Sequence, residues 1–320
     1  MIRQRALAIA LVPAAVLGLA ACSGGGGEFP SKRIDYILPF DPGGESDITA
    51  RLQQQPLEEV LGESVSISYK PGAGGALGWS ELTRSRPDGY TVMGCNIPHI
   101  ILQPMLRDDA GYETKAIKPV YFFQSTPNAL VVKADSEFET LEDFVAAAKE
   151  KPGGLSVGGS GDFSANHIGT LQFADAAGIE VSYTPFDGTG AAVPALLGGH
   201  VDALMTYTPQ IDALGDQVRP LAIMAEEPME GVDAPTFAEE GYDLADGAYR
   251  GVCVQEDTPQ EIVDTLAESF AAVNEDPALV EDFKAQAFNL ENYDPAQSLE
   301  LIDARTQEYT ALLDKLGMLG

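Results

Sequence analysis

The sequence is poor in the residues on which several common scaffolds and sites depend. Its 320 residues include 3 cysteines, 3 histidines, 1 tryptophan and 19 lysines and arginines, against 49 aspartates and glutamates. So few cysteines cannot build the disulfide scaffold of a small secreted domain, and so few histidines leave little material for a metal site. With a formal charge of -30, the chain lacks the basic footprint that a phosphate backbone requires. We therefore expect no nucleic-acid partner, no metal and no cofactor.

The chain nevertheless has enough apolar material to fold. Hydrophobic residues make up 45% of it and charged residues 21%, which is typical of a globular protein and not of a disordered chain. A length of 320 residues exceeds what one compact core usually holds. We therefore expect two lobes.

The N-terminus has the features of an export signal. Arg3 and Arg5 precede an apolar run over residues 6–21, which is shorter than the roughly 20 apolar residues that a membrane-spanning helix needs. Residues 1–21 are therefore interpreted as a signal peptide. The run ends at Cys22 in a Leu-Ala-Ala-Cys sequence that resembles the bacterial lipobox, in which the cysteine is lipidated and becomes the mature first residue.

Residues 22–28 follow as a flexible tether, because a glycine-rich chain has no side chains to pack. This predicts a protein exported from the cytoplasm and lipid-anchored to the outer face of the cell membrane, or periplasmic. The alternative is a simple secreted protein in which Cys22 has no role.

Short β-rich runs alternate with helical stretches, which is typical of parallel strands joined by helical crossovers. The first unit is expected to contain strands at 34–38, 65–69 and from 90 to 93, with helices after Ser46 and after Gly75. Pro56 should kink or split the first helix, because proline removes a backbone donor. The second unit, from about Asn128, is expected to contain strands at 129–132, 155–157, 181–184 and 201–205 and helices ending near 149, 177 and 197.

Three start signals divide the C-terminal part of the chain into helices. Residues 258–261 (Thr-Pro-Gln-Glu) are typical of a capping box with proline at the first helical position. Asp276-Pro277 and Asp294-Pro295 repeat that start signal. These helices need a surface to pack on, and we expect the first lobe to provide it.

Three glycine-rich loops stand after expected strands and before expected helices, at 39–47, 158–164 and 186–190. The first turn of a helix has unpaired N–H groups and a partial positive charge, so such a loop accepts an anion without a basic side chain. Two loops of this kind facing each other across a cleft would clamp a carboxylate. The same glycines are equally compatible with plain turns, so spacing alone leaves both interpretations open.

Six motifs follow one another along the chain. They are Phe29–Ile34 with Pro39–Asp47, Lys70–Gly78, Arg86–Thr91, Gly158–Gly161 with Ser164–His167, Pro185–Gly190 with Leu196–Asp202, and Ala234–Tyr242. In this order they resemble the motifs of the tripartite tricarboxylate transporter receptors, also called Bug receptors. The resemblance runs from about Phe29 to the C-terminus.

The resemblance implies an α/β chain with the type II periplasmic-binding-protein fold, in which two lobes joined by two crossover segments enclose a ligand cleft. Lobe 1 would take residues 29–127 and 248–320, and lobe 2 residues 128–247. Such receptors bind small carboxylates or related metabolites, partly through ordered water, and present them to membrane carrier subunits. We expect a monomer without catalytic residues. The residues that match the family's ligand loops are Phe40, Gly43, Gly44, Ser46, Asp47, Gly159, Ser160, Ser164, His167, Phe186, Asp187 and Gly188.

Two acidic residues depart from a simple carboxylate site. Many family members carry a Lys-Gly pair where this chain has Asp187-Gly188, although an acidic variant also occurs in the family. An aspartate there would suit an amine or hydroxyl on the ligand, and Glu45 adds a further negative charge. Both weaken the expectation of a citrate-like tricarboxylate, and the ligand itself stays open.

Several candidate residues also have a structural interpretation, which we favour from residue type. Asp47 is expected to favour the helix start through the helix dipole, Ser46 to cap the helix, and His167 to be packed or exposed. Cys95 and Cys253 could pair in an oxidising exterior, but two separate buried thiols are favoured because disulfide geometry is demanding.

Other functions remain as alternatives. Residues 158–162 resemble the nucleophile elbow of an exported α/β enzyme, but Asp162 stands where that motif closes with glycine. A receptor of another transporter, or of a signalling system, would share the same architecture. The motif series favours the tripartite system.

Overall fold

The computed structural model describes residues 29–186 and 188–319, so the predicted signal peptide, Cys22, the tether and Asp187 lie outside the described residues. The strands are β1 (Ile34–Leu38), β2 (Val65–Tyr69), β3 (Thr91–Ile97), β4 (Ile117–Lys133), β5 (Ser156–Ser160), β6 (Ser182–Phe186), β7 (Ala203–Tyr207), β8 (Val218–Ile223), β9 (Gly247–Gln255) and β10 (Asn289–Tyr293). The helices are α1 (Glu45–Leu61), α2 (Ala76–Leu82), α3 (His99–Leu106), α4 (Leu141–Glu150), α5 (Ala165–Ala177), α6 (Thr189–Leu197), α7 (Thr208–Leu214), α8 (Gln260–Asn274), α9 (Pro277–Ala285) and α10 (Pro295–Lys315).

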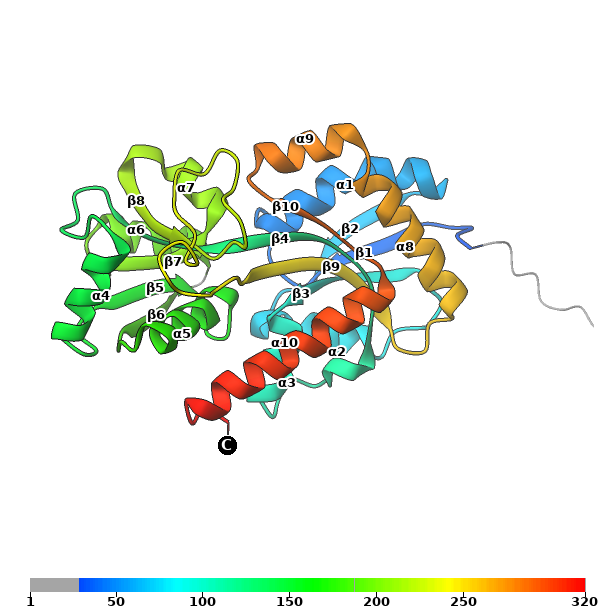
Figure 1. Ribbon diagram of the computed structural model, residues 1–320. Coiled ribbons are helices and arrows are strands. Elements are labelled where there is room, and N and C mark those ends of the chain that lie inside the picture. The colour runs from blue at the N-terminus through cyan, green and yellow to red at the C-terminus, as the bar shows by residue number, and fades with distance from the viewer. Residues whose placement is uncertain (1–28, 187, 320) are drawn as a thin grey trace, which may run out of the picture.

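Two strands, β4 and β9, join the two halves of the molecule (Figure 1). The strand order is β2-β1-β3-β9-β4-β7-β5-β6, and β10 and β8 also pair with β4. The N-terminal part of β4 pairs with β9 and β10, and its C-terminal part pairs with β7 and β8. We call β4 and β9 the crossing strands, and the two parts of the sheet the first and second halves.

Parallel pairs lie at the outer side of each half. In the first half β1 pairs in parallel with β2 and β3, and in the second half β5 pairs in parallel with β6 and β7. The crossing strands make only antiparallel pairs, β9 with β3 and β4, and β4 with β7, β8 and β10. The loops that leave β1, β5 and β6 therefore start from carboxyl ends of parallel strands, where α/β proteins commonly bind ligands.

Helices cover both faces of the first half. Side chains of α1, α8 and α9 pack on one face in a core that includes Leu57, Phe270 and Phe283. Side chains of α2, α3 and α10 pack on the other face, around Trp79 and Tyr309. The C-terminal helices thus pack on the first half, as expected.

The second half has its own layers. Helices α4 and α5 pack around Phe144 and Phe173, and α6 with neighbouring loops packs around Leu196 and Leu204 on the other side of the strands. The molecule thus consists of two α/β halves joined by the two crossing strands, which agrees with the predicted fold class. The proposed lobe boundaries stay a prediction.

Several local predictions are confirmed. β1 and β2 have the predicted bounds, α4 ends at Glu150, close to the predicted 149, and Asp276 and Asp294 cap α9 and α10. Trp79 is fully buried, and its indole N–H donates to the carbonyl of Gly94.

Other local predictions are wrong. Pro56 does not split α1, which is one continuous helix, and α1 begins at Glu45 after Gly44, so Ser46 does not cap it. The side chain of Thr258 caps nothing, since α8 starts after Pro259 and the Thr258 hydroxyl has no partner among the described residues. β4 begins at Ile117, well before the strand expected from Ala129. The first part of β4 was not predicted because it contains Pro119 and Pro127, and proline disfavours a strand. Pro119 lies at a register shift, where a sheet tolerates proline.

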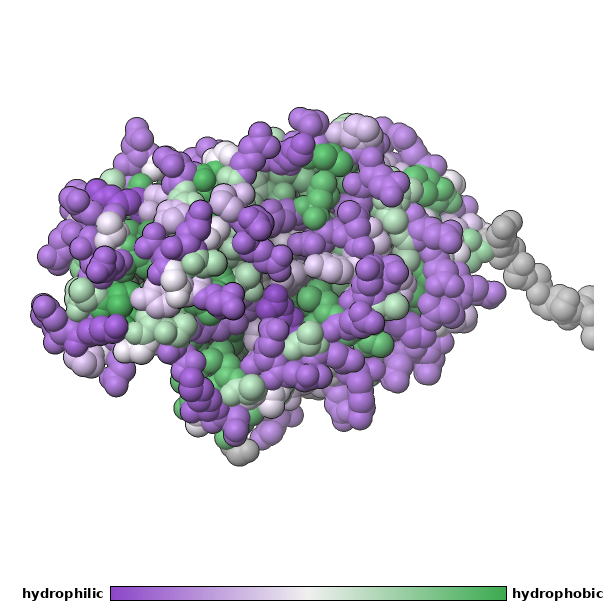
Figure 2. All heavy atoms as spheres, viewed as in Figure 1, coloured by the Kyte–Doolittle hydropathy of each residue, from purple (hydrophilic) through white to green (hydrophobic). Residues whose placement is uncertain are grey.

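Polar residues cover most of the face shown in Figure 2. Within residues 29–186 and 188–319, no helix combines the length and the apolar character needed to cross a bilayer.

Candidate functional site

Residues 39–44 form the loop between β1 and α1. A side chain of α1 holds this loop in shape. Gly43 has φ +87°, a left-handed conformation that favours glycine. Its N–H donates to Asp47 Oδ2 over 2.8 Å. Asp47 Oδ1 accepts from the Tyr69 hydroxyl at 2.7 Å and lies 2.9 Å from Arg51 Nε. Asp47 therefore positions the loop, which goes beyond the helix-dipole role favoured from the sequence.

The protonation of Asp47 follows from the same contacts. Burial of the carboxylate acts to raise its pKa, but hydrogen bonds from Tyr69, Gly43 and Arg51 outweigh burial and lower it. The carboxylate is therefore ionised at neutral pH and keeps accepting the Gly43 N–H.

No side chain caps the start of α1, where Gly44 is the N-cap residue. The N–H groups of Glu45 and Ser46 precede the first intrahelical hydrogen bonds and can receive an acceptor from outside the helix, whereas the N–H of Asp47 already donates to the Gly44 carbonyl. Ser46 instead accepts from the amide of Asn96 on β3 at 3.1 Å. This contact ties the helix start to the neighbouring strand.

Phe40 supplies an aromatic wall beside the loop. Its ring packs edge-on against Trp79 and against His99, with ring centroids 6.1 and 5.3 Å apart. Desolvation lowers the pKa of His99 to about 4, and the charge of Arg250 acts in the same direction. His99 is therefore neutral at physiological pH.

The side chain of Glu45 points to the crossing strands. Its Oε2 forms an ion pair with Nη2 of Arg250 on β9, and the Thr126 hydroxyl of β4 lies 3.3 Å from the same oxygen. Nη1 of Arg250 donates to Thr126 at 2.7 Å. The start of α1 is thus bound directly to the strands that join the two halves.

The loop between β5 and α5 is organised by Asn166 and His167. The backbone N–H and the hydroxyl of Ser160 both donate to Asn166 Oδ1. The Nδ1 of His167 accepts from the N–H of Phe163, a residue with φ +60°. Ser164 caps α5 by accepting from the His167 N–H.

His167 is packed, as expected. Its ring stacks on Tyr183 with centroids 4.3 Å apart. Burial lowers the pKa of His167, although Asp162 opposes the shift. The neutral ring can therefore accept the Phe163 N–H, and His167 acts as a support for the loop.

The third loop is tied to the second through Phe186. Its carbonyl oxygen accepts from the N–H of Gly161 and from the N–H of Gly188, each over 2.7 Å. Gly188 is the N-cap residue of α6 and, like Gly44, provides no side-chain cap. Gly159, by contrast, lies within β5, where a Cβ atom would lie 2.5 Å from the Tyr183 hydroxyl. Gly159 therefore serves close packing against Tyr183. The motif in the sequence could not distinguish this role from ligand contact.

Arg250 and Tyr207 connect the first loop to the second. The Arg250 guanidinium lies over the ring of Tyr207, 5.9 Å from its centroid. Burial raises the pKa of Tyr207 to about 12, while Arg250 and the nearby Ser160 hydroxyl oppose the shift. A chain of contacts thus runs from Glu45 through Arg250 and Tyr207 to Ala165, the first residue of α5 after the second loop, and it brings the predicted ligand loops of the two halves to one place.

The sequence analysis missed Arg250, Thr126, Tyr207 and Asn96. A signal for Arg250 was present, because it is the only basic residue between Arg219 and Lys284 and it stands in an apolar run. Tyr207 ends a strand directly before Thr208-Pro209, which is a helix-start signal like those recognised nearer the C-terminus.

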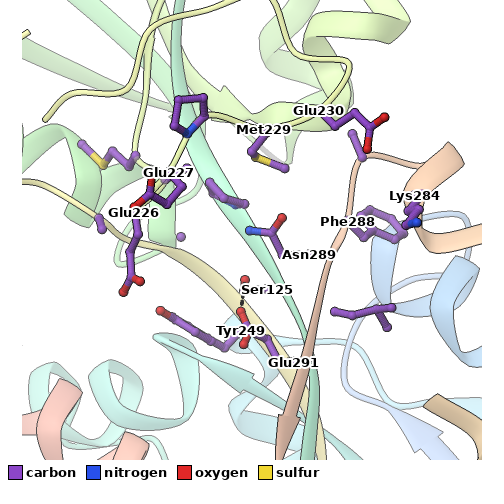
Figure 3. Close-up of a pocket in the computed structure, with 18 of the residues that line it drawn as sticks. Ser125, Glu226, Glu227, Met229, Glu230, Tyr249, Lys284, Phe288, Asn289 and Glu291 are labelled. Atoms are coloured by element: carbon purple, nitrogen blue, oxygen red, sulfur yellow. Dashed lines mark hydrogen bonds between the residues drawn. The ribbon is translucent and has the colours of Figure 1, made fainter. Parts of the chain in front are cut away.

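A separate pocket of about 960 Å³ lies on the other face of the crossing strands (Figure 3). Side chains alternate along a strand, and Tyr249 and Ser125 line this pocket while their neighbours Arg250 and Thr126 contact Glu45. None of the described candidate residues lines it. Its charged side chains are Glu226, Glu227, Glu230, Asp246, Glu281, Lys284 and Glu291. This acidic lining disfavours a carboxylate ligand there.

Cys95 and Cys253 are both buried and free, on the neighbouring strands β3 and β9. Met93, not Cys95, is the register partner of Cys253. Among residues 29–186 and 188–319 no three His, Cys, Asp or Glu side chains are grouped to hold a metal ion.

Comparison with known proteins identifies the family. A model of the tripartite tricarboxylate transporter family receptors matches residues 49–318. The chain belongs to this receptor family. The match covers the second and third candidate loops and all of the second half, and it begins just after the first loop.

Relatives of the receptor resemble it over nearly their whole length. Protein BugT of Bordetella pertussis is 27% identical, over 90% of this chain and 90% of the relative. A TctC solute-binding protein from Polaromonas is 28% identical, with a TM-score of 0.75 over 90% of this chain and 100% of that chain. The Rhodopseudomonas palustris protein Rpa4515, solved with adipate, shares the fold with a TM-score of 0.82 at 23% identity, over 91% of this chain and 99% of that chain.

Proposed function

We propose that the receptor is an exported solute-binding lipoprotein that captures a small carboxylate between its two halves and delivers it to a tripartite tricarboxylate-type membrane carrier. The chain of contacts from Glu45 to Ala165 carries this proposal, because it brings the glycine loops of both halves to one place. The adipate bound to the R. palustris protein supports the ligand class, since adipate is a small carboxylate.

The ligand carboxylate would be held by main-chain amides. The N-cap residues of α1 and α6 are the glycines Gly44 and Gly188, which have no side chain to cap the helix and let a ligand approach closely. Ser164 already caps α5 and both donors of Ser160 bind Asn166, so the second loop would contribute through its shape and the packing of its side chains. Phe40 and Phe186 would provide apolar walls on either side. A contact between Asp187 and the ligand stays a prediction from the sequence.

Movement of the halves completes the proposed mechanism. Each half packs its own helices, and the crossing strands join them at Pro127 and Gly247. Ligand in the cleft would favour the closed arrangement, and the carrier would recognise the closed surface. Lobe boundaries at 127/128 and 247/248, the lipid anchor at Cys22, a monomeric state and the absence of catalysis belong to the same proposal.

A thermal-shift screen of the purified protein tests the proposal. The panel contains mono-, di- and tricarboxylates, amino acids and aromatic acids. A ligand at 100 times its dissociation constant should stabilise the protein by about 2.7 kcal/mol, because it binds the folded state alone. Isothermal titration then measures the stoichiometry, for which one site is expected.

The proposal fails if no carboxylate in the panel shifts the unfolding temperature. It also fails if the protein turns over a panel compound. A crystal structure with ligand in the acidic pocket of Figure 3, and none at the loops, would contradict the proposal, because that pocket lies on the other face of the crossing strands.

A further inference from the structure

Both arginines that contact the first turns of α1 are already bound to carboxylates of that helix. Arg51 pairs with Asp47 at 2.9 Å on the outer side, where the arginine side chain is 57% exposed. Arg250 pairs with Glu45 on the inner side, and both are largely buried, with 9% and 17% of their side chains exposed. In the part of the chain that the structure describes, both arginines next to the ligand loop are therefore neutralised by a carboxylate.

The guanidinium of Arg250 is held by two partners, and the arginine side chain is only 9% exposed. Nη2 binds Glu45, Nη1 donates to Thr126, and Nε is buried without a partner among the described residues. A ligand carboxylate that took the place of Glu45 would exchange one carboxylate partner of Arg250 for another. That exchange replaces one buried ion pair with another and leaves Glu45 unpaired, which is costly in a site shielded from water.

Arg250 also removes the repulsion that Glu45 would otherwise exert. Glu45 is the first residue of α1, next to the N–H groups that would receive the ligand. An unpaired carboxylate there would repel a ligand carboxylate at close range, where salt screens weakly. The pair thus permits one ligand carboxylate at the amides and offers nothing to a second.

We propose that Glu45 and Arg250 form a specificity pair that makes the receptor prefer monocarboxylates to dicarboxylates of the same length. This rests on the proposed function, because it assumes that the carboxylate binds at the loop amides. Glu45 acts as an internal competitor that occupies Arg250. Removing its charge should release Arg250 for the second carboxylate of a ligand.

Hexanoate and adipate are matched six-carbon probes for this proposal. Titration calorimetry compares the wild type with Glu45→Gln, which keeps the shape of the side chain. The wild type should bind hexanoate more tightly than adipate. In Glu45→Gln the affinity for adipate should rise by about tenfold or more relative to the affinity for hexanoate, because both ligands gain from the freed cation but only adipate has a second carboxylate for Arg250.

The double variant Glu45→Gln/Arg250→Gln separates the charge effect from a change of shape. It keeps the Glu45→Gln substitution and removes the cation, so the gain for adipate should disappear. Circular dichroism checks that both variants are folded.

The specificity pair is overturned if Glu45→Gln binds adipate no more tightly than the wild type does. Undetectable binding of adipate by this variant counts as the same result. A gain that persists in the double variant, or a wild type that prefers adipate, also overturns it. These outcomes are independent of the carboxylate screen, since a hit in that screen combined with no gain for adipate removes the pair alone.

Discussion

Gly43 shows how a single residue can determine the shape of the first ligand loop. Its φ is +87°, an angle that residues with a Cβ atom adopt only under strain. A Cβ atom added to Gly43 would have no atom of another residue within 4 Å, its chain neighbours aside. The space beside it is therefore open. Its N–H is fixed by Asp47, so the loop is shaped before a ligand arrives.

Gly43→Val should abolish carboxylate binding and leave the fold intact. Valine would strain the backbone by about 1–2 kcal/mol and place its methyl groups in the open space. Binding is measured with a ligand identified by the thermal-shift screen, and stability by urea unfolding.

Gly153→Val is the matched control, because Gly153 has φ +69° and equally open surroundings in a turn remote from the loops. It should lose similar stability and bind normally. Unchanged affinity in Gly43→Val would show that the first loop is not the ligand site.

At the scale of elements, α10 is bound to the start of β9 through buried charges. Nη1 of Arg305 lies 3.7 Å from Oδ1 of Asp246, whose side chain is 3% exposed. Nη2 of the same arginine donates to the Tyr249 hydroxyl at 2.6 Å. Gln172 of α5 donates to Asp246 at 2.9 Å, so helices from both halves meet at this carboxylate.

Arg305→Met should destabilise the protein by about 3 kcal/mol at neutral pH, because it leaves the buried Asp246 carboxylate without its cation. Burial already raises the pKa of Asp246, while Arg305 opposes the shift, so the variant should raise it further. A carboxyl whose folded pKa is raised loses stability as pH rises through that range. The deficit should therefore shrink as pH falls from 7, as measured by urea unfolding.

Glu308→Gln serves as the control, since Glu308 contacts the same arginine but its side chain is 53% exposed. Its loss should be below about 1 kcal/mol. Equal losses in the two variants would show that the contact with Asp246 contributes little.

At the scale of the whole molecule, the charge opposes the proposed ligand. A formal charge of -30 repels an anion at long range, so electrostatic steering cannot explain capture. The cations next to the first loop are neutralised by Glu45 and Asp47. Short-range donors would therefore have to provide the affinity.

Carboxylate binding should strengthen modestly with salt, by about twofold between low and physiological ionic strength. Salt screens the remote carboxylates beyond roughly 8 Å and leaves the short contacts in the cleft nearly unchanged. Calorimetric titrations of a screened ligand at several salt concentrations measure the effect. A marked loss of affinity with salt would mean that free basic side chains bind the ligand.

Much of the fold was predictable because its signals are local. Alternating apolar residues predicted β1 and β2, and Asp-Pro pairs predicted the starts of α9 and α10. The long strand β4 was only partly predicted, because local rules treat Pro119 and Pro127 as interruptions while neighbouring strands hold both in the sheet. Pro56 is likewise accommodated within α1.

The candidate site was predictable only where its residues lie in motifs. The loops around Gly43, Ser160 and Gly188 were expected, and the structure brings them near one another. Their supports were not expected, because Arg250 is 205 positions from Glu45 in the sequence and Tyr207 is 47 positions from Ser160.

The sequence alone determined the strand and helix alternation, the glycine loops, the acidity and the likeness to a receptor family, since these depend on residue type and short spacing. Only the tertiary structure decided which charges neutralise one another. The pairing of Glu45 with Arg250, and of Asp246 with Arg305, depends on which segments the sheet brings into contact. Burial then makes those pairs matter, because in the interior an unpaired charge has no water to stabilise it.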